Sequence, residues 1–285
     1  MSSPGLSAPD YAFIRELARE SAGIVIEQGK EYLVETRLGP LAAREGFASL
    51  EAFVASLRAH PRNGQHRKAV EAMTINETSF FRDIRPFDAL KQVVLPEVIA
   101  RNAATRQLNI WSAACSSGQE PYSLAMLLRE HFPQLAGWTI RIFGTDLSEE
   151  MLKRAASGRY GQLEVNRGLP APLLIKYFQR SGLDWVIREE LRRMVQFLPA
   201  NLTGEWPSLP RMDVVLIRNV MIYFDVETKK RILARIRGLL RPGGALFLGA
   251  SETTLNLDVP LERILAAGAT YYRDAAAAPA AGQKP

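Results

Sequence analysis

Apolar residues recur at helical spacing through the first quarter of the chain. Three sets each fall on one face of a helix: Phe13, Ile14, Leu17 and Ala18; Leu33, Val34, Leu38 and Leu41; and Leu50, Phe53, Val54 and Leu57. Asp10 and Ser49 are predicted N-caps, and Gly46 and Pro61 are predicted helix breakers. The pattern therefore predicts a bundle of three or four short helices over residues 10–73.

After residue 107 the pattern changes to short apolar runs that alternate with helical segments. Strands are predicted at 108–115, 138–146, 195–202, 212–219 and 245–250, helices at about 120–131, 148–157 and 226–240, and a hairpin near 262–273. Continuously apolar strands separated by helices are typical of a parallel sheet that is covered on both faces. The sequence therefore predicts a doubly wound α/β domain, whose ligands bind beyond the carboxyl ends of the strands.

Residues 159–194 interrupt this alternation. A turn signal at Ser181-Gly182 separates two β-favouring stretches, which predicts an inserted antiparallel hairpin. The predicted organisation is then a helical domain at 1–75, a linker and entry to the α/β domain at 76–107, the α/β domain with its insert at 108–273, and a disordered low-complexity tail at 274–285.

Composition excludes several kinds of protein and site. The 285 residues are 47% hydrophobic and 23% charged, as in globular proteins. The single cysteine, Cys115, excludes a disulfide framework, and three histidines (His60, His66 and His131) leave little for a metal site or a Ser-His-Asp triad. No apolar run is long enough to cross a bilayer, and the amino terminus has no secretory signal features. We therefore expect a cytoplasmic protein with no bound metal and no membrane insertion.

The net charge of +6 lies outside the helical region. Residues 1–75 carry nine basic and nine acidic side chains, and no run of five or six like charges occurs anywhere. A scattered excess of this size is more often related to solubility than to nucleic acid, so we expect no nucleic-acid partner. Within the helical region Lys30, Arg37 and Arg44 recur every seven residues along one side of a helix. This basic stripe is either a solvated face or a docking surface for an acidic partner helix.

Two carboxylates stand where the first two strands of the α/β region end. The turn at 114–121 is neither a dinucleotide fingerprint nor a Walker loop, and it places Glu120 at a helix N-terminus just before Pro121. A carboxylate there repels phosphate and attracts a sulfonium or ammonium, although it also complements the helix dipole. Asp146 ends the next strand, where an acidic residue binds ribose hydroxyls or caps the following helix. Together with the turn at 242–244, the two acids indicate an S-adenosylmethionine-dependent methyltransferase.

Five segments resemble the signatures of one known family. They are NETSFFRD at 76–83, SGQEPYS at 117–123, GTD at 144–146, RNVMIYF at 218–224, and RPGG at 241–244 followed by GASE at 249–252. In these segments, and in their order, the chain is similar to the CheR family of chemotaxis receptor glutamate methyltransferases. The resemblance implies an all-helical N-terminal domain and a Rossmann-like S-adenosylmethionine-dependent methyltransferase domain with an inserted small antiparallel β subdomain.

The resemblance also implies roles for individual residues. The expected cofactor contacts are Asn76, Thr78, Arg82, Glu120, Asp146, Asn201, Leu202, Arg218 and Asn219. Asn201 and Leu202 are expected near the adenine, and Arg82 and Tyr223 near the transferring methyl group and the substrate carboxylate. The implied reaction forms glutamate methyl esters on the cytoplasmic helical domain of chemoreceptors and leaves S-adenosylhomocysteine. We expect a monomeric enzyme.

Simpler roles are open for several of these residues. Phe80 and Phe81 are predicted to pack in the core or linker, Cys115 to be a small buried residue, and His131 to be a helix-end residue. Asn219 is also compatible with merely ending a strand, and Tyr223 with a buried position in a helix.

One departure from the family and two competing functions bear on these expectations. Some family members use a glycine-rich loop of the β subdomain to bind a receptor's carboxyl-terminal pentapeptide. The corresponding residues 179–185 are fewer and include one glycine, which predicts no dependence on such a tether. A methyltransferase of RNA or another small acceptor, and a non-catalytic scaffold that senses S-adenosylmethionine, are the alternatives. The presence of Arg82, Glu120 and Asp146 argues against the scaffold.

Overall fold

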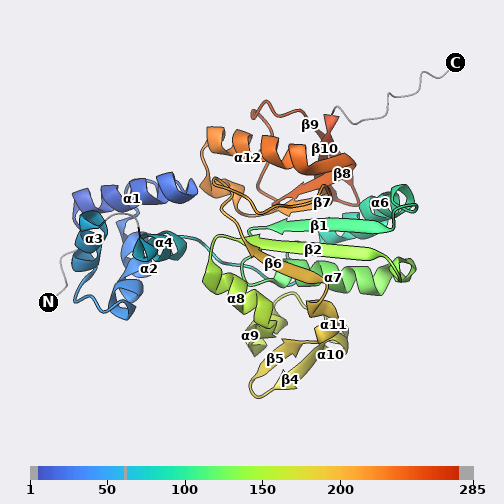
Figure 1. Cartoon of the computed structure of the whole chain (residues 1–285), viewed down its shortest axis with the longest axis horizontal. Coiled ribbons are helices and arrows are strands. Elements are labelled where there is room, and N and C mark those ends of the chain that lie inside the picture. Colours follow the sequence, from blue (N-terminus) through green and yellow to red (C-terminus); the bar gives the residue numbers. More distant parts are fainter. Residues whose placement is uncertain (1–5, 61–62, 276–285) are drawn as a thin grey trace. The chain divides into compact units, whose positions relative to one another are not determined.

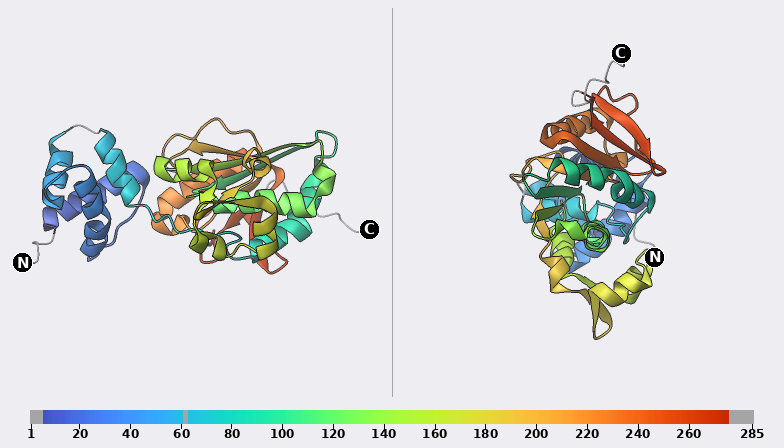
Figure 2. Two further views of the ribbon diagram at one scale, coloured as in Figure 1. Left: turned by 90° about the horizontal axis from the view of Figure 1, so that it is seen from below. Right: turned by 90° about the vertical axis from the view of Figure 1, so that its right-hand side faces the viewer.

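The computed structural model describes residues 6–60 and 63–275, which fall into two compact units (Figures 1 and 2). The first unit comprises residues 1–75 and 223–228, and the second comprises residues 76–222 and 229–285. Pro61 and most of the predicted tail lie outside the described residues.

Helices form the described part of residues 1–75. They are α1 (Ala8–Ala22), α2 (Glu31–Arg44), α3 (Leu50–Ala59) and α4 (Gly64–Ala72). The predicted bundle is confirmed, but the predicted cap of α1 is wrong. Ser7 caps α1 and accepts a hydrogen bond from the Asp10 backbone N–H, because Pro9 fits the first turn of a helix and lets it begin earlier. Ser49 caps α3 as predicted, and Gly46, with φ of +83°, follows the end of α2.

The second unit is built on a sheet whose described strands follow the order β6-β2-β1-β7-β8-β10-β9. These strands are β1 (Gln107–Ala113), β2 (Thr139–Asp146), β6 (Val195–Pro199), β7 (Met212–Ile217), β8 (Leu240–Leu248), β9 (Leu261–Ala266) and β10 (Ala269–Asp274). Neighbouring strands from β6 to β8 are parallel, and β10 is antiparallel to both β8 and β9. The predicted doubly wound domain is therefore confirmed, with the predicted hairpin at one edge of the sheet.

Alternate strand residues divide between the two faces of this sheet. Ile110, Ile142 and Phe247 join a buried core with residues 85–101 and with α7 (Gln119–His131). Residues 85–101, for which the pattern predicts no element, form α5 (Arg85–Ala89), the π-helical segment η1 (Leu90–Val94) and α6 (Leu95–Arg101). The spacing of apolar residues in this stretch does not follow the α-helical period, because the π-helical segment adds a residue to the turn and moves the apolar face around the helix. α12 (Val226–Leu239) matches the helix predicted at 226–240.

The insert is a small antiparallel sheet with short helices. After α8 (Glu149–Ser157) come β3 (Arg159–Tyr160), α9 (Gln162–Asn166), α10 (Ala171–Tyr177), β4 (Phe178–Ser181), β5 (Asp184–Ile187) and α11 (Glu189–Arg192). The strands pair in the order β3-β5-β4, which confirms the predicted hairpin. The stretch before the hairpin turn is helical up to Tyr177 rather than β, because Pro172 in the first turn of α10 favours helix initiation.

Two features are absent from residues 6–60 and 63–275. None of the helices found there is both long and apolar enough to span a membrane. The same residues contain no group of three or more His, Cys, Asp or Glu side chains arranged to hold a metal ion.

Candidate active site

The turn between β1 and α7 has an unusual backbone conformation. Ala114, Ser116 and Gly118 have φ values of +56°, +50° and +92°. Non-glycine residues with a left-handed backbone conformation are uncommon, and they are concentrated at functional sites. A Cβ added to Gly118 would lie 2.8 Å from the Cβ of Ala155, so close packing also requires glycine there. This turn sets Glu120 in the first turn of α7.

Asp146 ties the end of β2 to this turn. Its carboxylate accepts hydrogen bonds from the backbone N–H of Ser116 (2.7 Å) and of Ser148 (2.9 Å). Burial raises the pKa of Asp146, and these N–H donors partly oppose that effect. Ser148, and not Asp146, is the N-cap of α8, because the Ser148 hydroxyl accepts from the Met151 N–H. The simpler interpretation of Asp146 as a helix cap is therefore wrong.

The carboxylate of Glu120 is held from both sides. Oε1 accepts from the Ser112 hydroxyl at 2.7 Å, and Oε2 accepts from Nη1 of Arg218 at 2.7 Å. The Arg218 side chain is 2% exposed, and its Nη2 also donates to the Arg82 carbonyl (2.7 Å) and to Asp83 Oδ2 (3.0 Å). Arg218 thus joins α7 to the NETSFFRD segment through a buried ion pair.

The NETSFFRD segment lies over the same turn. The Ser116 hydroxyl donates to the Asn76 carbonyl at 2.8 Å, and the Phe81 N–H donates to Ser123 Oγ at 2.9 Å. Arg82 is half-buried, and its Nη1 donates to the Glu77 carbonyl at 2.8 Å.

Packing of the two phenylalanines in this segment agrees with their predicted role. Phe80 is fully buried and packs edge-on against Tyr160 and Phe178. A Cβ added to Gly168 would lie 2.0 Å from the Phe80 carbonyl oxygen, so the backbone approach there requires glycine. Phe81 packs edge-on against Phe87.

Asn219 follows β7 in a left-handed conformation with φ of +59°. Its N–H donates to Glu252 Oε2 at 2.9 Å, and the Gly249 N–H donates to the same oxygen at 2.6 Å. A Cβ on Gly249 would lie 2.6 Å from that oxygen. Glu252 therefore fixes the turn after β7 to the end of β8, and Asn219 does more than end a strand.

The residues predicted near the adenine lie in the loop after β6. The Asn201 side chain accepts from the Thr203 N–H at 3.0 Å, and the Leu202 carbonyl accepts from Trp206 Nε1 at 3.1 Å. Arg235 lies 3.8 Å above the centre of the Trp206 ring, and the Trp206 ring packs edge-on against Trp111. These contacts order the loop around Leu202, which is 7% exposed.

Hydrogen bonds join most of the predicted cofactor residues into one cluster at the carboxyl end of the sheet. They link Asn76, Arg82, Glu120, Asp146 and Arg218 through the β1–α7 turn. Thr78 is half-buried in the NETSFFRD segment. Tyr223 lies in the short helix η3 (Met221–Tyr223) and is grouped with the first unit.

Ser112, Ser116, Asp83 and Glu252 were not predicted as site residues. Asp83 and Glu252 stand inside quoted signature segments, which was the available signal. Nothing in the sequence marks Ser112 or Ser116 as a site residue, because a serine near a strand end is compatible with many roles.

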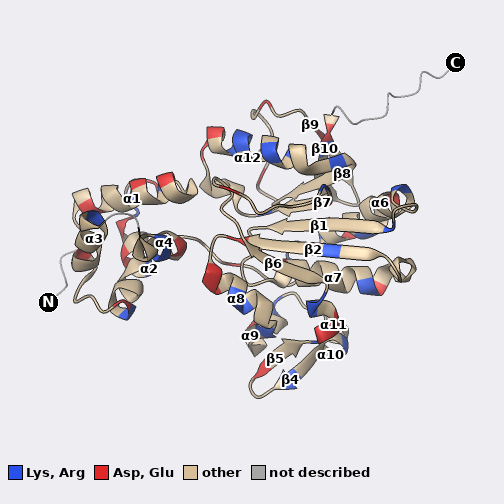
Figure 3. Cartoon of the chain, in the orientation of Figure 1, with Lys and Arg blue, Asp and Glu red and all other residues tan. Residues whose placement is uncertain are grey.

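The basic stripe is not uniform. Lys30 is half-buried at the N-cap of α2, and Arg44 is exposed at the last residue of that helix. Arg37 between them is half-buried and donates to the Met73 carbonyl at 2.6 Å and to the Thr74 carbonyl at 3.3 Å. Arg37 therefore has a structural task that Arg44 does not share. Lys, Arg, Asp and Glu are interspersed along the described chain (Figure 3).

The chemistry of the cluster suits S-adenosylmethionine. Three carboxylates (Glu120, Asp146 and Asp83) belong to this cluster with one buried guanidinium group, that of Arg218, so acidic groups outnumber basic ones. An excess negative charge favours a sulfonium or ammonium and disfavours phosphate. Burial raises the pKa of the Cys115 thiol, which makes it a poor nucleophile, as predicted.

Comparisons with known proteins agree with this geometry. Residues 9–74 match the family model "CheR methyltransferase, all-alpha domain", and residues 76–266 match "CheR methyltransferase, SAM binding domain". Chemotaxis protein methyltransferase 1 of Pseudomonas aeruginosa is 43% identical over 268 residues, which are 93% of this chain and 97% of that protein. Chemotaxis protein methyltransferase Cher2 of Pseudomonas putida is 43% identical over 85% of this chain and 90% of its own length. A chemotaxis protein methyltransferase of Vibrio parahaemolyticus is 36% identical over 93% of this chain and 96% of its own length.

These matches span the helical domain, the α/β domain and all the signature segments, and they confirm the resemblance seen in the sequence. The chain therefore belongs to the CheR methyltransferase family, and its α/β domain is the S-adenosylmethionine-binding domain of a methyltransferase.

Proposed function

We propose that this protein transfers the methyl group of S-adenosylmethionine to glutamate side chains of chemoreceptors, forming methyl esters in the cytoplasm. The observation that carries the proposal is the pair of Glu120, just after β1, and Asp146, at the end of the adjacent parallel strand β2. Arg218 ties Glu120 to the NETSFFRD segment. The names of the full-length relatives support the chemotactic substrate class.

The proposed chemistry needs no general base from the chain. A glutamate carboxylate has a pKa of about 4.3 and is already a nucleophile at neutral pH. S-adenosylmethionine, when bound, supplies a methyl group on a strongly electrophilic sulfonium. His131, the histidine of the α/β domain, ends α7 about 16 Å along the helix from Glu120, as expected for a helix-end residue. The chain's task is to align the reacting groups and exclude water.

We assign Glu120 to the cationic part of the cofactor and Asp146 to its ribose hydroxyls, with Asn76, Thr78, Arg218 and Asn219 around them. Asn201 and Leu202 are assigned to the adenine. Ser112 and Arg218 orient Glu120, and the backbone N–H groups of Ser116 and Ser148 orient Asp146. These contacts fix both carboxylates before any ligand arrives.

Arg82 and Tyr223 are assigned to the substrate carboxylate. The charges of the attacking carboxylate and the sulfonium cancel in the transition state, so a strong cationic clamp would favour the ground state. We infer that Arg82 orients the carboxylate and that the Tyr223 hydroxyl donates a weaker hydrogen bond. Turnover and cofactor affinity of Arg82→Ala and Tyr223→Phe test these roles. Near-normal turnover in both variants would contradict them.

Docking of an acidic receptor helix is assigned to Lys30, Arg37 and Arg44, acting in a monomeric enzyme. Because Arg37 also binds backbone carbonyls, Arg44→Glu is the cleaner test. We expect Arg44→Glu to raise the receptor KM about threefold at low salt and to make methylation less sensitive to ionic strength. Lys153→Glu, at an exposed position on α8, is the control. An unchanged salt dependence would identify the stripe as a solvated face.

The β subdomain is proposed to lack a tethering function. Ser181 pairs with Asp184, so only Gly182 and Leu183 form the loop between β4 and β5. A two-residue loop offers little surface for a peptide. Tight binding of an isolated receptor-tail pentapeptide in calorimetry would contradict this part of the proposal.

One assay separates the proposed function from its alternatives. Labelled S-adenosylmethionine is incubated with the protein and receptor-containing membranes, and the label retained on a filter is treated with base. We expect receptor-bound label that base releases, as a methyl ester requires. Label in RNA would support the RNA methyltransferase, and cofactor binding without transfer would support the scaffold.

A further inference from the structure

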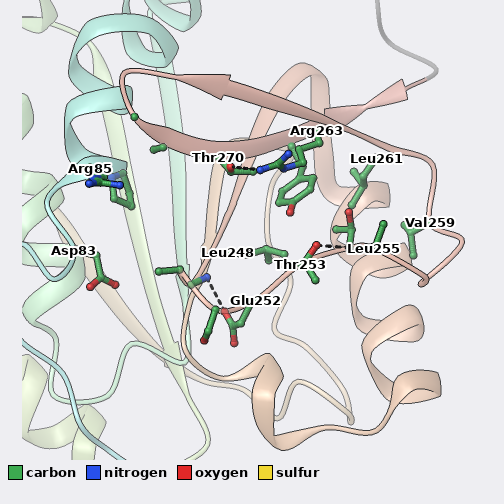
Figure 4. Close-up of a pocket in the computed structure, with 18 of the residues that line it drawn as sticks. Asp83, Arg85, Leu248, Glu252, Thr253, Leu255, Val259, Leu261, Arg263 and Thr270 are labelled. Atoms are coloured by element: carbon green, nitrogen blue, oxygen red, sulfur yellow. Dashed lines mark hydrogen bonds between the residues drawn. The ribbon is translucent and has the colours of Figure 1, made fainter.

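A cavity of about 930 Å³ lies beyond the carboxyl end of β8, within the second unit. Residues 83–86, the segment 248–256 and the β9–β10 hairpin enclose it (Figure 4). Cavities that bind ligands commonly have volumes of roughly 300–1,000 Å³. None of the residues assigned above to the cofactor lines it.

This cavity shares a wall with the proposed methyl-transfer site. Asp83 lines the cavity and accepts from Arg218, which in turn binds Glu120. Glu252 lines it as well and accepts from the backbone N–H of Asn219. The acidic side chains of this wall are therefore already engaged with the active-site cluster.

Two arginines, Arg85 and Arg263, are the other charged residues that line the cavity. Within the described ranges the Arg85 side chain has no ion pair or hydrogen bond, and the Arg263 side chain bonds only to the neutral Thr270 hydroxyl at 3.2 Å. Arg85 packs against the hairpin turn, since its Cδ would lie 3.8 Å from a Cβ on Gly268. Two unneutralised guanidinium groups in one cavity favour a carboxylate ligand.

The opposite side of the cavity is apolar. Figure 4 shows Leu255, Val259 and Leu261 gathered there, across from Asp83 and Arg85. Leu255 is 72% exposed, which is unusual for a leucine beside a cavity of this size. A ligand that fills the cavity would carry an acidic group and an aliphatic group on one side, as an amphipathic acidic helix does.

We propose that this cavity binds the segment of the acceptor protein next to the methylated glutamate, with further acidic side chains held separately by Arg85 and by Arg263 and an aliphatic side chain packed on Leu255, Val259 and Leu261. The inference rests on the proposed function, because the shared wall of Asp83 and Glu252 places the cavity beside the cluster assigned to methyl transfer.

Kinetics of the full-length enzyme with the receptor test the proposal. We expect the double variant Arg85→Ala/Arg263→Ala to raise the receptor KM about tenfold or more, with turnover at saturating receptor and the S-adenosylmethionine Kd close to wild type. Leu255→Ser is expected to raise KM about threefold. Arg141→Ala, an exposed arginine on β2, is the matched control. An unchanged KM in the double variant would overturn the proposal.

A direct binding measurement keeps this inference separate from the proposed function. Fluorescence anisotropy compares a synthetic amphipathic helical peptide that carries two glutamates with the same peptide carrying glutamines. Wild type should prefer the glutamate peptide, the double alanine variant should lose most of that preference, and Arg85→Glu/Arg263→Glu should bind a lysine peptide more tightly than wild type does. Equal binding of all peptides, or none by wild type, would overturn the cavity assignment even if no receptor is methylated.

Discussion

Two buried carboxylate clusters stand at opposite ends of the same sheet and differ in what they can do. At the amino end, Asp213 is fully buried and accepts from the Asn109 N–H at 2.9 Å, from Asn102 Nδ2 at 2.8 Å and from Arg101 Nη2 at 3.2 Å. At the carboxyl end, Glu120 and Asp146 lie where β1 and β2 end, beside residues with positive φ angles.

Burial and the presence of a charge alone do not distinguish the Asp213 cluster from the cluster that we assign to the cofactor. The Asp213 cluster ties α6, β1 and β7 together and is saturated by its donors. In the Glu120 cluster acidic groups outnumber basic ones, and its backbone is held in uncommon conformations. We therefore expect the same isosteric substitutions to affect stability at one end and cofactor binding at the other.

The largest effect on stability is expected from Asp213→Asn. The asparagine side chain would turn its N–H groups toward the N–H donors that the Asp213 carboxylate now accepts from. The free energy of unfolding, measured by urea denaturation, should therefore fall by about 3 kcal/mol. The folded variant should bind S-adenosylmethionine as wild type does. Asp184→Asn, whose partner Arg159 is exposed, is the control and should change stability by less than about 0.5 kcal/mol. A weakened cofactor affinity in Asp213→Asn would break the distinction between the two ends.

Glu120→Gln should have the largest effect on cofactor binding. Loss of this charge weakens the attraction of the site for a cation, so the Kd for S-adenosylmethionine in calorimetry should rise about 30-fold or more. The free energy of unfolding should fall by only about 1 kcal/mol, because Arg218 keeps Asp83. Glu150→Gln, an exposed carboxylate in the first turn of α8, is the control. An unchanged Kd would remove Glu120 from the site.

How much of this fold and site can be predicted depends on how far apart in the sequence the interacting residues lie. The apolar run at 214–217 in β7 and the placement of Glu120 and Asp146 near adjacent strand ends follow from local pattern and sheet topology. The helical stretch at 85–101 does not, because η1 shifts its periodicity. The roles of Asp83 and Glu252 could not be predicted either, since their partners Arg218 and Asn219 lie 135 and 33 residues away.

Asp146→Asn sharpens the comparison with Asp213→Asn through the direction in which stability depends on pH. The folded-state pKa of Asp146 is raised by burial, so its stabilising contribution is present below the unfolded pKa and is lost as pH rises through the folded pKa. Asp146→Asn removes a buried charge but turns an amide N–H toward one of the two backbone donors, so at neutral pH its free energy of unfolding should fall by less than that of Asp213→Asn. The gain in stability of the variant on acidification should be smaller than that of wild type. The Kd for S-adenosylmethionine should rise about tenfold. A loss of stability like that of Asp213→Asn would contradict this account.

Ser112→Ala should give the smallest effect. The variant removes one neutral donor from Glu120, so the cofactor Kd should rise about threefold in the same calorimetric assay. Asn109, on the same strand, donates its backbone N–H to Asp213, and Asn109→Ala should leave the Kd unchanged. Equal Kd values in the two variants would show that Ser112 does not orient Glu120.

Mass spectrometry of receptor peptides tests the central claim most directly. Receptors incubated with S-adenosylmethionine and the wild-type enzyme should gain the mass of a methyl group on glutamate side chains, and mild base should remove it. The Glu120→Gln variant should leave the same peptides unmodified. Methyl groups on lysine, on a backbone amine or on no receptor peptide would contradict the assignment of this protein as a glutamate methyltransferase of chemoreceptors.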